Sequence, residues 1–229
     1  MATIEGGTSA ILLEVGEAAA KPAHVTDKPI PYGALGHYRF SVTTGILAAA
    51  LAAGAVVFSA RWSHPTNLAL ITGFRTRFLP LTPFTAATLT DASSFDAFVA
   101  TGFTAAHTGG TALTLTGTAL KVRQSMAASS FTDIRIATTA ALAGGTLALT
   151  AHPFAQSIRK ANRVNPALGT EEVIPPTFDG LNVDYTPGGE HPETLSQDMG
   201  IVVRNRTVWP AAGTGILLVE MAWAETTAF

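Results

Sequence analysis

Hydrophobic and polar residues alternate along several segments of the chain, as they do in β-strands with one buried face. In residues 56–62, one face would carry Val56, Phe58, Ala60 and Trp62, and the other Val57, Ser59 and Arg61. Similar patterns mark strand candidates at residues 37–43, 68–79, 111–117, 131–138, 146–150, 200–209 and 215–225. Glycine-containing turns separate several of them. The pattern predicts an all-β fold, an antiparallel β-sandwich of jelly-roll-like form.

The strand candidates also suggest which charged side chains face water. In residues 68–79, Arg75 and Arg77 fall opposite an apolar face. In residues 215–225, Glu220 falls opposite the face that carries Leu217, Val219, Met221 and Trp223. Arg61 and the Asp133–Arg135 segment are read as outward strand faces, where an arginine lies over Trp62 or pairs with an aspartate.

The last two strand candidates flank a short connection that contains Pro210 and Gly213. A connection of this length favours pairing of its flanking strands, so we predict that an antiparallel hairpin closes the chain. Helix candidates are short and few, at residues 91–100 and 47–53. We expect a helix content well below one quarter.

Residues 41–60 carry no charge over twenty positions, which is about the length that spans a bilayer. However, they consist largely of Ala, Thr, Ser and Gly, and their end alternates as a strand does. We therefore expect a strand end, a loop or short helix, and a second strand, with no membrane span. The N-terminus also lacks the basic segment of a secretory signal.

Residues 1–36 show little periodicity and contain Pro22, Pro29 and Pro31, which favour extended backbone. We predict an extended N-terminal arm, with a disordered tail as the alternative, and a β-sandwich body at residues 37–229. Within the body, residues 161–200 are rich in Pro, Gly and acids and predict a long surface excursion. The arm residues expected to bind a partner are Ile11, Leu12, Leu13, Val15 and Val25.

Composition points to assembly. Only 13% of the residues are charged, against about 25% in a typical domain, and the chain has 40 Ala and 32 Thr. Such neutral surfaces suit subunit contacts or a coat of Thr and Ser, so we expect a homo-oligomer. With 14 basic and 16 acidic residues, no field attracts a phosphate backbone, and we expect no direct nucleic-acid partner.

No recognisable motif indicates catalysis or a cofactor. The chain has no cysteine, and its six histidines have no zinc-motif spacing. The G-x-S-x-G, P-loop and G-x-G-x-x-G arrangements are missing as well. An oxygen-rich segment has no EF-hand spacing and is read as a solvated loop; it contains Asp179, Asn182, Asp184, Glu190, His191 and Glu193. We expect no enzyme, cofactor or metal site.

Several phrases of the sequence resemble a family of tailed-bacteriophage virion structural proteins. They are residues 36–39, 57–62, 110–117, 133–137 and 191–192, and the resemblance extends to residues 13–15 of the arm. The resemblance implies a particle component with a β-rich body, and it carries over no catalytic residue. It does not choose between head, collar and tail.

These observations lead to one expected function and two alternatives. We expect a capsid decoration or cement protein of the phage particle, made in the host cytoplasm, that forms a homo-oligomer, for which we expect a trimer. Its other partner would be the major capsid protein or another virion protein. The alternatives are a tail or head fibre protein that binds a host surface, and a β-fold hydrolase of cell-wall glycans, which would need two carboxylates about 5 to 9.5 Å apart in a groove.

Overall fold

The computed structural model describes residues 3–4, 13–14, 35–82, 95–115, 120–122, 125–156, 182–184 and 192–227. The chain divides into two units, Met1–Pro31 and Tyr32–Phe229. In the first unit, strands β1 (Thr3–Ile4) and β2 (Leu13–Glu14) form an antiparallel pair. The remaining strands belong to the second unit.

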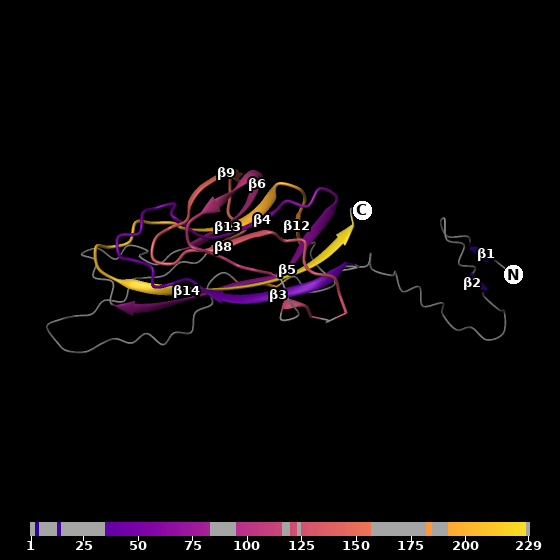
Figure 1. The fold of residues 1–229 in the computed structure, drawn as a ribbon, viewed down its shortest axis with the longest axis horizontal. Helices are drawn as coiled ribbons and strands as arrows, with labels where there is room; N and C mark the ends of the chain where they lie inside the picture. Colours follow the sequence, from indigo (N-terminus) through magenta and orange to yellow (C-terminus); the bar gives the residue numbers. More distant parts are fainter. Residues whose placement is uncertain are drawn as a thin grey trace. The chain divides into compact units, whose positions relative to one another are not determined.

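Two antiparallel sheets make up the second unit, and its described residues contain no α-helix (Figure 1). The five-stranded sheet has the order β11 (Asn182–Asp184), β5 (Asn67–Thr82), β14 (Thr214–Thr227) and β3 (Gly36–Thr43), with β12 (Glu193–Leu195) also on β5. The seven-stranded sheet has the order β10 (Ala155–Gln156), β6 (Phe95–Thr108), β13 (Met199–Asn205), β4 (Val56–Trp62), β8 (Asp133–Ile136) and β7 (Thr111–Ala112), with β9 (Ala143–Leu149) also on β6. This confirms the predicted antiparallel β-sandwich, while its jelly-roll form stays a prediction.

Aromatic side chains fill the space between the sheets. Phe58 of β4 lies 6.0 Å from the ring of Phe40 and 6.2 Å from that of Phe74, so it contacts two strands of the other sheet. Phe131 lies between Trp62, at 4.9 Å, and Trp223, at 5.3 Å. Edge-to-face contacts of this kind contribute about 0.5–1.5 kcal/mol each beyond the area they bury. They join the two sheets into one core.

The strongest alternating segments form strands where the pattern predicts them. Residues 37–43, 56–62, 68–79 and 215–225 all lie within strands of nearly the same bounds. The segments at 131–138 and 200–209 are shorter, as Asp133–Ile136 and Met199–Asn205. Of residues 111–117, only Thr111–Ala112 is a strand among the positions described.

The predicted closing hairpin is wrong. Strand β13 pairs with β4 and β6 in one sheet, whereas β14 pairs with β3 and β5 in the other. The connection crosses between the sheets because Trp209, at its centre, is buried against Phe78 and Phe95. Its backbone N–H donates to the carbonyl of Leu51 at 2.8 Å. Loop length alone did not reveal this buried anchor.

Both helix candidates are also wrong. The described part of residues 91–100 belongs to β6, in which residues 95–100 are all buried. A short, mainly apolar segment fits a fully buried strand as well as a helix. Residues 47–53 form a loop, so residues 41–60 are a strand end, a loop and a second strand. Within the part of the chain that the structure describes, no helix is long and apolar enough to cross a membrane.

The seven-stranded sheet does not have the single wet face that the alternation predicts. Val57 and Ser59, expected outside, are 0% and 2% exposed. Val57 belongs to the main core, beside a register shift between β4 and β13. Ser59 lies opposite Val202, on the face where a second cluster packs: Ala100, Phe103 and Val202 with Leu147 and Leu149 of β9. Two stretches of the predicted surface excursion, β11 and β12, add to the edge of β5.

Candidate functional site

The outer face of the five-stranded sheet gathers charged side chains from three neighbouring strands. In β3, Phe40 is buried in the core while Arg39 and Ser41 are exposed. The same alternation buries Phe74 of β5 and Met221 of β14 and leaves Arg75 and Glu220 half-buried. A two-residue period on three paired strands therefore produces one polar surface.

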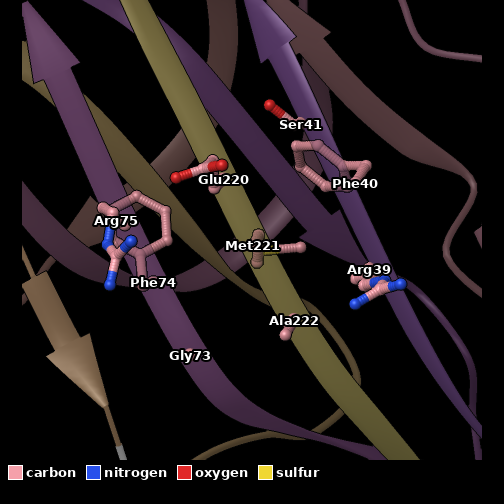
Figure 2. Close-up of a pocket in the computed structure, with 9 residues that line it drawn as sticks. All are labelled: Arg39, Phe40, Ser41, Gly73, Phe74, Arg75, Glu220, Met221 and Ala222. Carbon is pink, nitrogen blue, oxygen red and sulfur yellow. The ribbon is translucent and has the colours of Figure 1, made fainter. Parts of the chain in front are cut away.

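The strand register places these residues in two adjacent rows. Glu220 lies opposite Ser41 on one side and Arg75 on the other. Ala222, two residues on, lies opposite Arg39 and Gly73. Together the rows line an open hollow of about 390 Å³, which Figure 2 shows along β14 between β3 and β5.

Small residues make the hollow. Because Gly73 has no side chain and Ala222 only a methyl group, the row that begins at Arg39 has space above the sheet. The longer side chains of Arg39, Arg75 and Glu220 stand around that space (Figure 2). The floor thus consists of backbone and the methyl group of Ala222, and the walls carry the charges.

Two arginines, Arg39 and Arg75, and one glutamate, Glu220, line the hollow. Arg77 lies one row beyond Arg75 on β5, opposite Leu218, and is exposed. Within the described residues, no ion pair joins Arg39 or Glu220 to another side chain. Three arginines and one glutamate on one sheet face suit an anionic group that also offers hydrogen-bond donors.

A second charged cluster, around Arg61, connects strands. Its guanidinium donates to Asp133 and to Asp198, each at 2.9 Å, and its Nε donates to the carbonyl of Phe103. Asp133 lies directly opposite Arg61 on β8, and Asp198 lies in the turn before β13. This confirms pairing with an aspartate, one of the two arrangements expected for these outward strand charges.

Two buried carboxylates hold parts of the sandwich together. Asp96 of β6 accepts from Arg206, which follows β13. Glu225, 1% exposed, accepts from Ser129 at 2.6 Å, from the backbone of Ser130 at 3.0 Å and from Trp223 at 3.1 Å. It fixes the segment before Phe131 to the end of β14. Burial, followed by the charge of Glu225, raises the pKa of the neighbouring Tyr38 to about 12.

The residues singled out from the sequence are placed as follows. The predicted partner-binding residues Ile11, Leu12, Val15 and Val25 lie outside the described residues, and only Leu13 is placed, in β2. In the oxygen-rich segment, Asn182 and Asp184 are the first and last residues of β11, and Glu193 is the first residue of β12. In the described ranges, no group of three or more His, Cys, Asp or Glu side chains is placed to hold a metal ion.

Sequence reasoning did not identify the hollow, although it placed Arg75, Arg77 and Glu220 on outer faces. The alternation shows which side of a strand a residue occupies, but not which strands are neighbours. The register β3–β14–β5 is what brings Arg39 and Glu220 to one surface. Gly73 and Ala222, which create the space, carry no chemical signal in the sequence.

No protein-family model, curated protein or solved structure matches the chain. The fold and the site define an antiparallel β-sandwich with a hollow, lined by Arg39, Arg75 and Glu220, on the open face of one sheet.

Proposed function

We propose that the chain is a structural protein of a tailed-bacteriophage virion, a decoration or cement protein that assembles as a homo-oligomer on the capsid. The resemblance of its sequence phrases to such proteins supports this function, as does its all-β body. The low content of charged residues, 13%, supports self-association.

One observation carries the proposal of self-association. Strands β5 and β14 continue past Thr43 of β3, and this extension has an apolar outer surface. Leu79 and Leu81 are 48% and 43% exposed, and Ile216, opposite Leu79, is half-buried. Exposed leucines side by side on a sheet are better buried than wet. A second copy of the chain is the occupant we propose, most simply in a trimer.

The charged clusters support a non-enzymatic role. The carboxylates of Asp133 and Asp198 approach each other only through Arg61, which binds both. Asp96 and Glu225 are likewise engaged in contacts between strands and loops. Neutralised or multiply hydrogen-bonded carboxylates of this kind act as cross-links in a β-sandwich.

The first experiment tests assembly by sedimentation of the full chain at micromolar concentration. We expect a trimer for the natural chain and a monomer for the double variant Leu79→Glu/Leu81→Glu, because charges on the apolar extension oppose its burial. Val122→Glu is the matched control, since Val122 is 55% exposed and lies outside this surface. A natural chain that sediments as a monomer contradicts the proposal.

The second experiment tests location. Antibody labelling of intact particles should mark the heads, and separated heads should retain the protein while separated tails do not. Residues 1–31 would attach the body to the major capsid protein, so a chain that starts at Tyr32 should bind heads less well. Absence of the protein from purified particles contradicts a virion role.

A tail or head fibre protein that binds a host surface is the second candidate. The hollow with Arg39 and Glu220 favours it, because a ligand site is of use to a protein that meets a cell. Labelling confined to fibres would decide for this candidate. Release of soluble sugar from purified cell walls by the pure protein would instead decide for the hydrolase.

A further inference from the structure

We propose that the hollow on the five-stranded sheet binds a carboxylated sugar, such as a uronic acid residue of an acidic polysaccharide. The proposal does not rest on the virion function. At about 390 Å³, the hollow falls within the range of about 300–1,000 Å³ that is typical of small-molecule sites. Its open side allows one residue of a longer polymer to enter while the chain continues on both sides.

Arg39 would recognise the carboxylate. Its side chain is exposed at the edge of the hollow, and no ion pair engages it within the described residues. A guanidinium presents a planar pair of N–H donors that fits both oxygens of one carboxylate. Arg75, on the far side of β14, lines the same space.

Glu220 favours a sugar acid over a simple anion as the ligand. It stands in the same row as Ser41 and Arg75, half-buried. A carboxylate accepts hydrogen bonds only, so it favours a ligand with hydroxyl donors. It also repels a ligand that is anionic on every side, such as phosphate. A uronic acid offers a carboxylate for Arg39 and hydroxyl groups for Glu220 and Ser41.

The floor of the hollow fits a sugar ring. Gly73 and Ala222 leave a floor of backbone and one methyl group, on which the C–H face of a pyranose can lie. The aromatic rings of Phe40 and Phe74 are buried in the core, so the site selects by charge and hydrogen bonding. A bulkier residue in place of Ala222 would occupy this position.

The test is an NMR titration of the full chain with sodium glucuronate, glucose and inorganic phosphate. We expect glucuronate to bind most tightly. Arg39→Gln should weaken its binding roughly tenfold, the loss expected for one charge-assisted contact. Ala222→Leu should reduce it as much by filling the floor. Glu220→Gln should strengthen phosphate binding and so narrow the preference for glucuronate.

Arg77→Gln is the matched control. It removes the same charge from the same strand face but lies one row beyond the hollow, so glucuronate binding should change less than about twofold. Circular dichroism and a thermal melt of each variant establish that it is folded. Equal losses in Arg39→Gln and Arg77→Gln would indicate diffuse surface charge and overturn the site. Glucuronate binding no tighter than that of phosphate or glucose would overturn the proposed ligand.

Discussion

The two sheets of the sandwich differ in what lies on their outer faces. In β3 of the five-stranded sheet, buried Tyr38 and Phe40 alternate with half-buried or exposed positions, and the outer face is open at Arg39. In β4 of the seven-stranded sheet, Val57 and Phe58 are both fully buried, so the strand has no wet side there. The five-stranded sheet has an open outer face at β3, whereas the seven-stranded sheet is covered on both sides at β4.

The difference comes from the long strand β6. Its register with β9 shifts between Thr101 and Ala105, and Gly102 between them has a φ of 57°, a conformation that suits glycine. Beyond this point Phe103 packs with Val202 on the outer side of β13. Figure 1 shows β9 on the side of β13 away from β14. A bend in one strand thus covers the sheet to which it belongs.

The largest effect is expected where the sheets meet. Trp223→Ala removes a buried ring that contacts Tyr38 at 5.5 Å, Phe40 at 5.8 Å and Phe131 at 5.3 Å. It also removes the indole N–H that Glu225 accepts. We expect a loss of about 3–5 kcal/mol in the free energy of unfolding, measured by urea denaturation.

Leu218→Ala is its control on the same strand, because Leu218 is half-buried on the outer face. It should cost less than about 1 kcal/mol. Similar losses in the free energy of unfolding for the two variants would show that the outer face of β14 is buried as deeply as the core. This result would contradict an open outer face on the five-stranded sheet.

The second effect concerns the cover of the seven-stranded sheet. Phe103→Ala empties the centre of the second cluster, and we expect a loss of about 3 kcal/mol. Hydrogen exchange should accelerate first in β9 and later in β14, because the space between the sheets keeps its contacts. The exposed Thr104→Ala is the control. Uniform acceleration would mean that the cover and the core unfold as one unit.

A third effect compares one substitution on both sheets. Ser59 and Ser41 are both on outer strand faces, but Ser59 is 2% exposed and Ser41 is exposed. Ser59→Leu should overpack the covered face and cost about 1–3 kcal/mol, while Ser41→Leu should change stability by at most about 0.5 kcal/mol. Thermal melts of the two variants measure the difference. If both are tolerated, the cover over Ser59 is loose.

The same contrast explains what the sequence could predict. Where one face is open, as in β14, the two-residue period identified both the strand and its buried side correctly. In β4, Val57 and Ser59 were assigned to water because alternation is the only signal of a face. The register shift beside Val57, which is part of the main core, and the second cluster on the face of Ser59 leave no such signal. In β6, residues 95–100 are mainly apolar and do not alternate, so the pattern did not reveal the strand.

The sequence pattern also could not predict which strands pair with each other. The strands β13 and β14 were each located, but the partner of each depends on Trp209, whose burial follows from contacts with Phe78 and Phe95. The candidate site has the same dependence. Its charged residues lie on strands that the pattern located, and only the register of three strands brings them around Gly73 and Ala222.

The smallest effect is a pH dependence confined to the cover. His107 of β6 is 4% exposed, lies edge-on to Phe103 at 5.4 Å and has no hydrogen-bond partner for Nδ1. Burial lowers the pKa of His107 below its ordinary value of 6.5. Below pH 6.5 the unfolded chain therefore binds a proton that the folded chain does not. As the pH is lowered below 6.5, the free energy of unfolding therefore falls until the pH reaches the lowered pKa of His107 in the folded state.

Thermal melts at pH 7.5 and pH 5.5 measure this loss, which His107→Leu should reduce. A substitution at the exposed His152, His152→Gln, is the control and should keep the loss of the natural chain. Hydrogen exchange at pH 5.5 should locate the loosening in β9, whose Gly145 lies against the imidazole, and not in β14. If His107→Leu loses as much thermal stability between pH 7.5 and pH 5.5 as the natural chain, the acid sensitivity arises elsewhere. The stability of the covered face of the seven-stranded sheet would then depend on pH no more than that of the core.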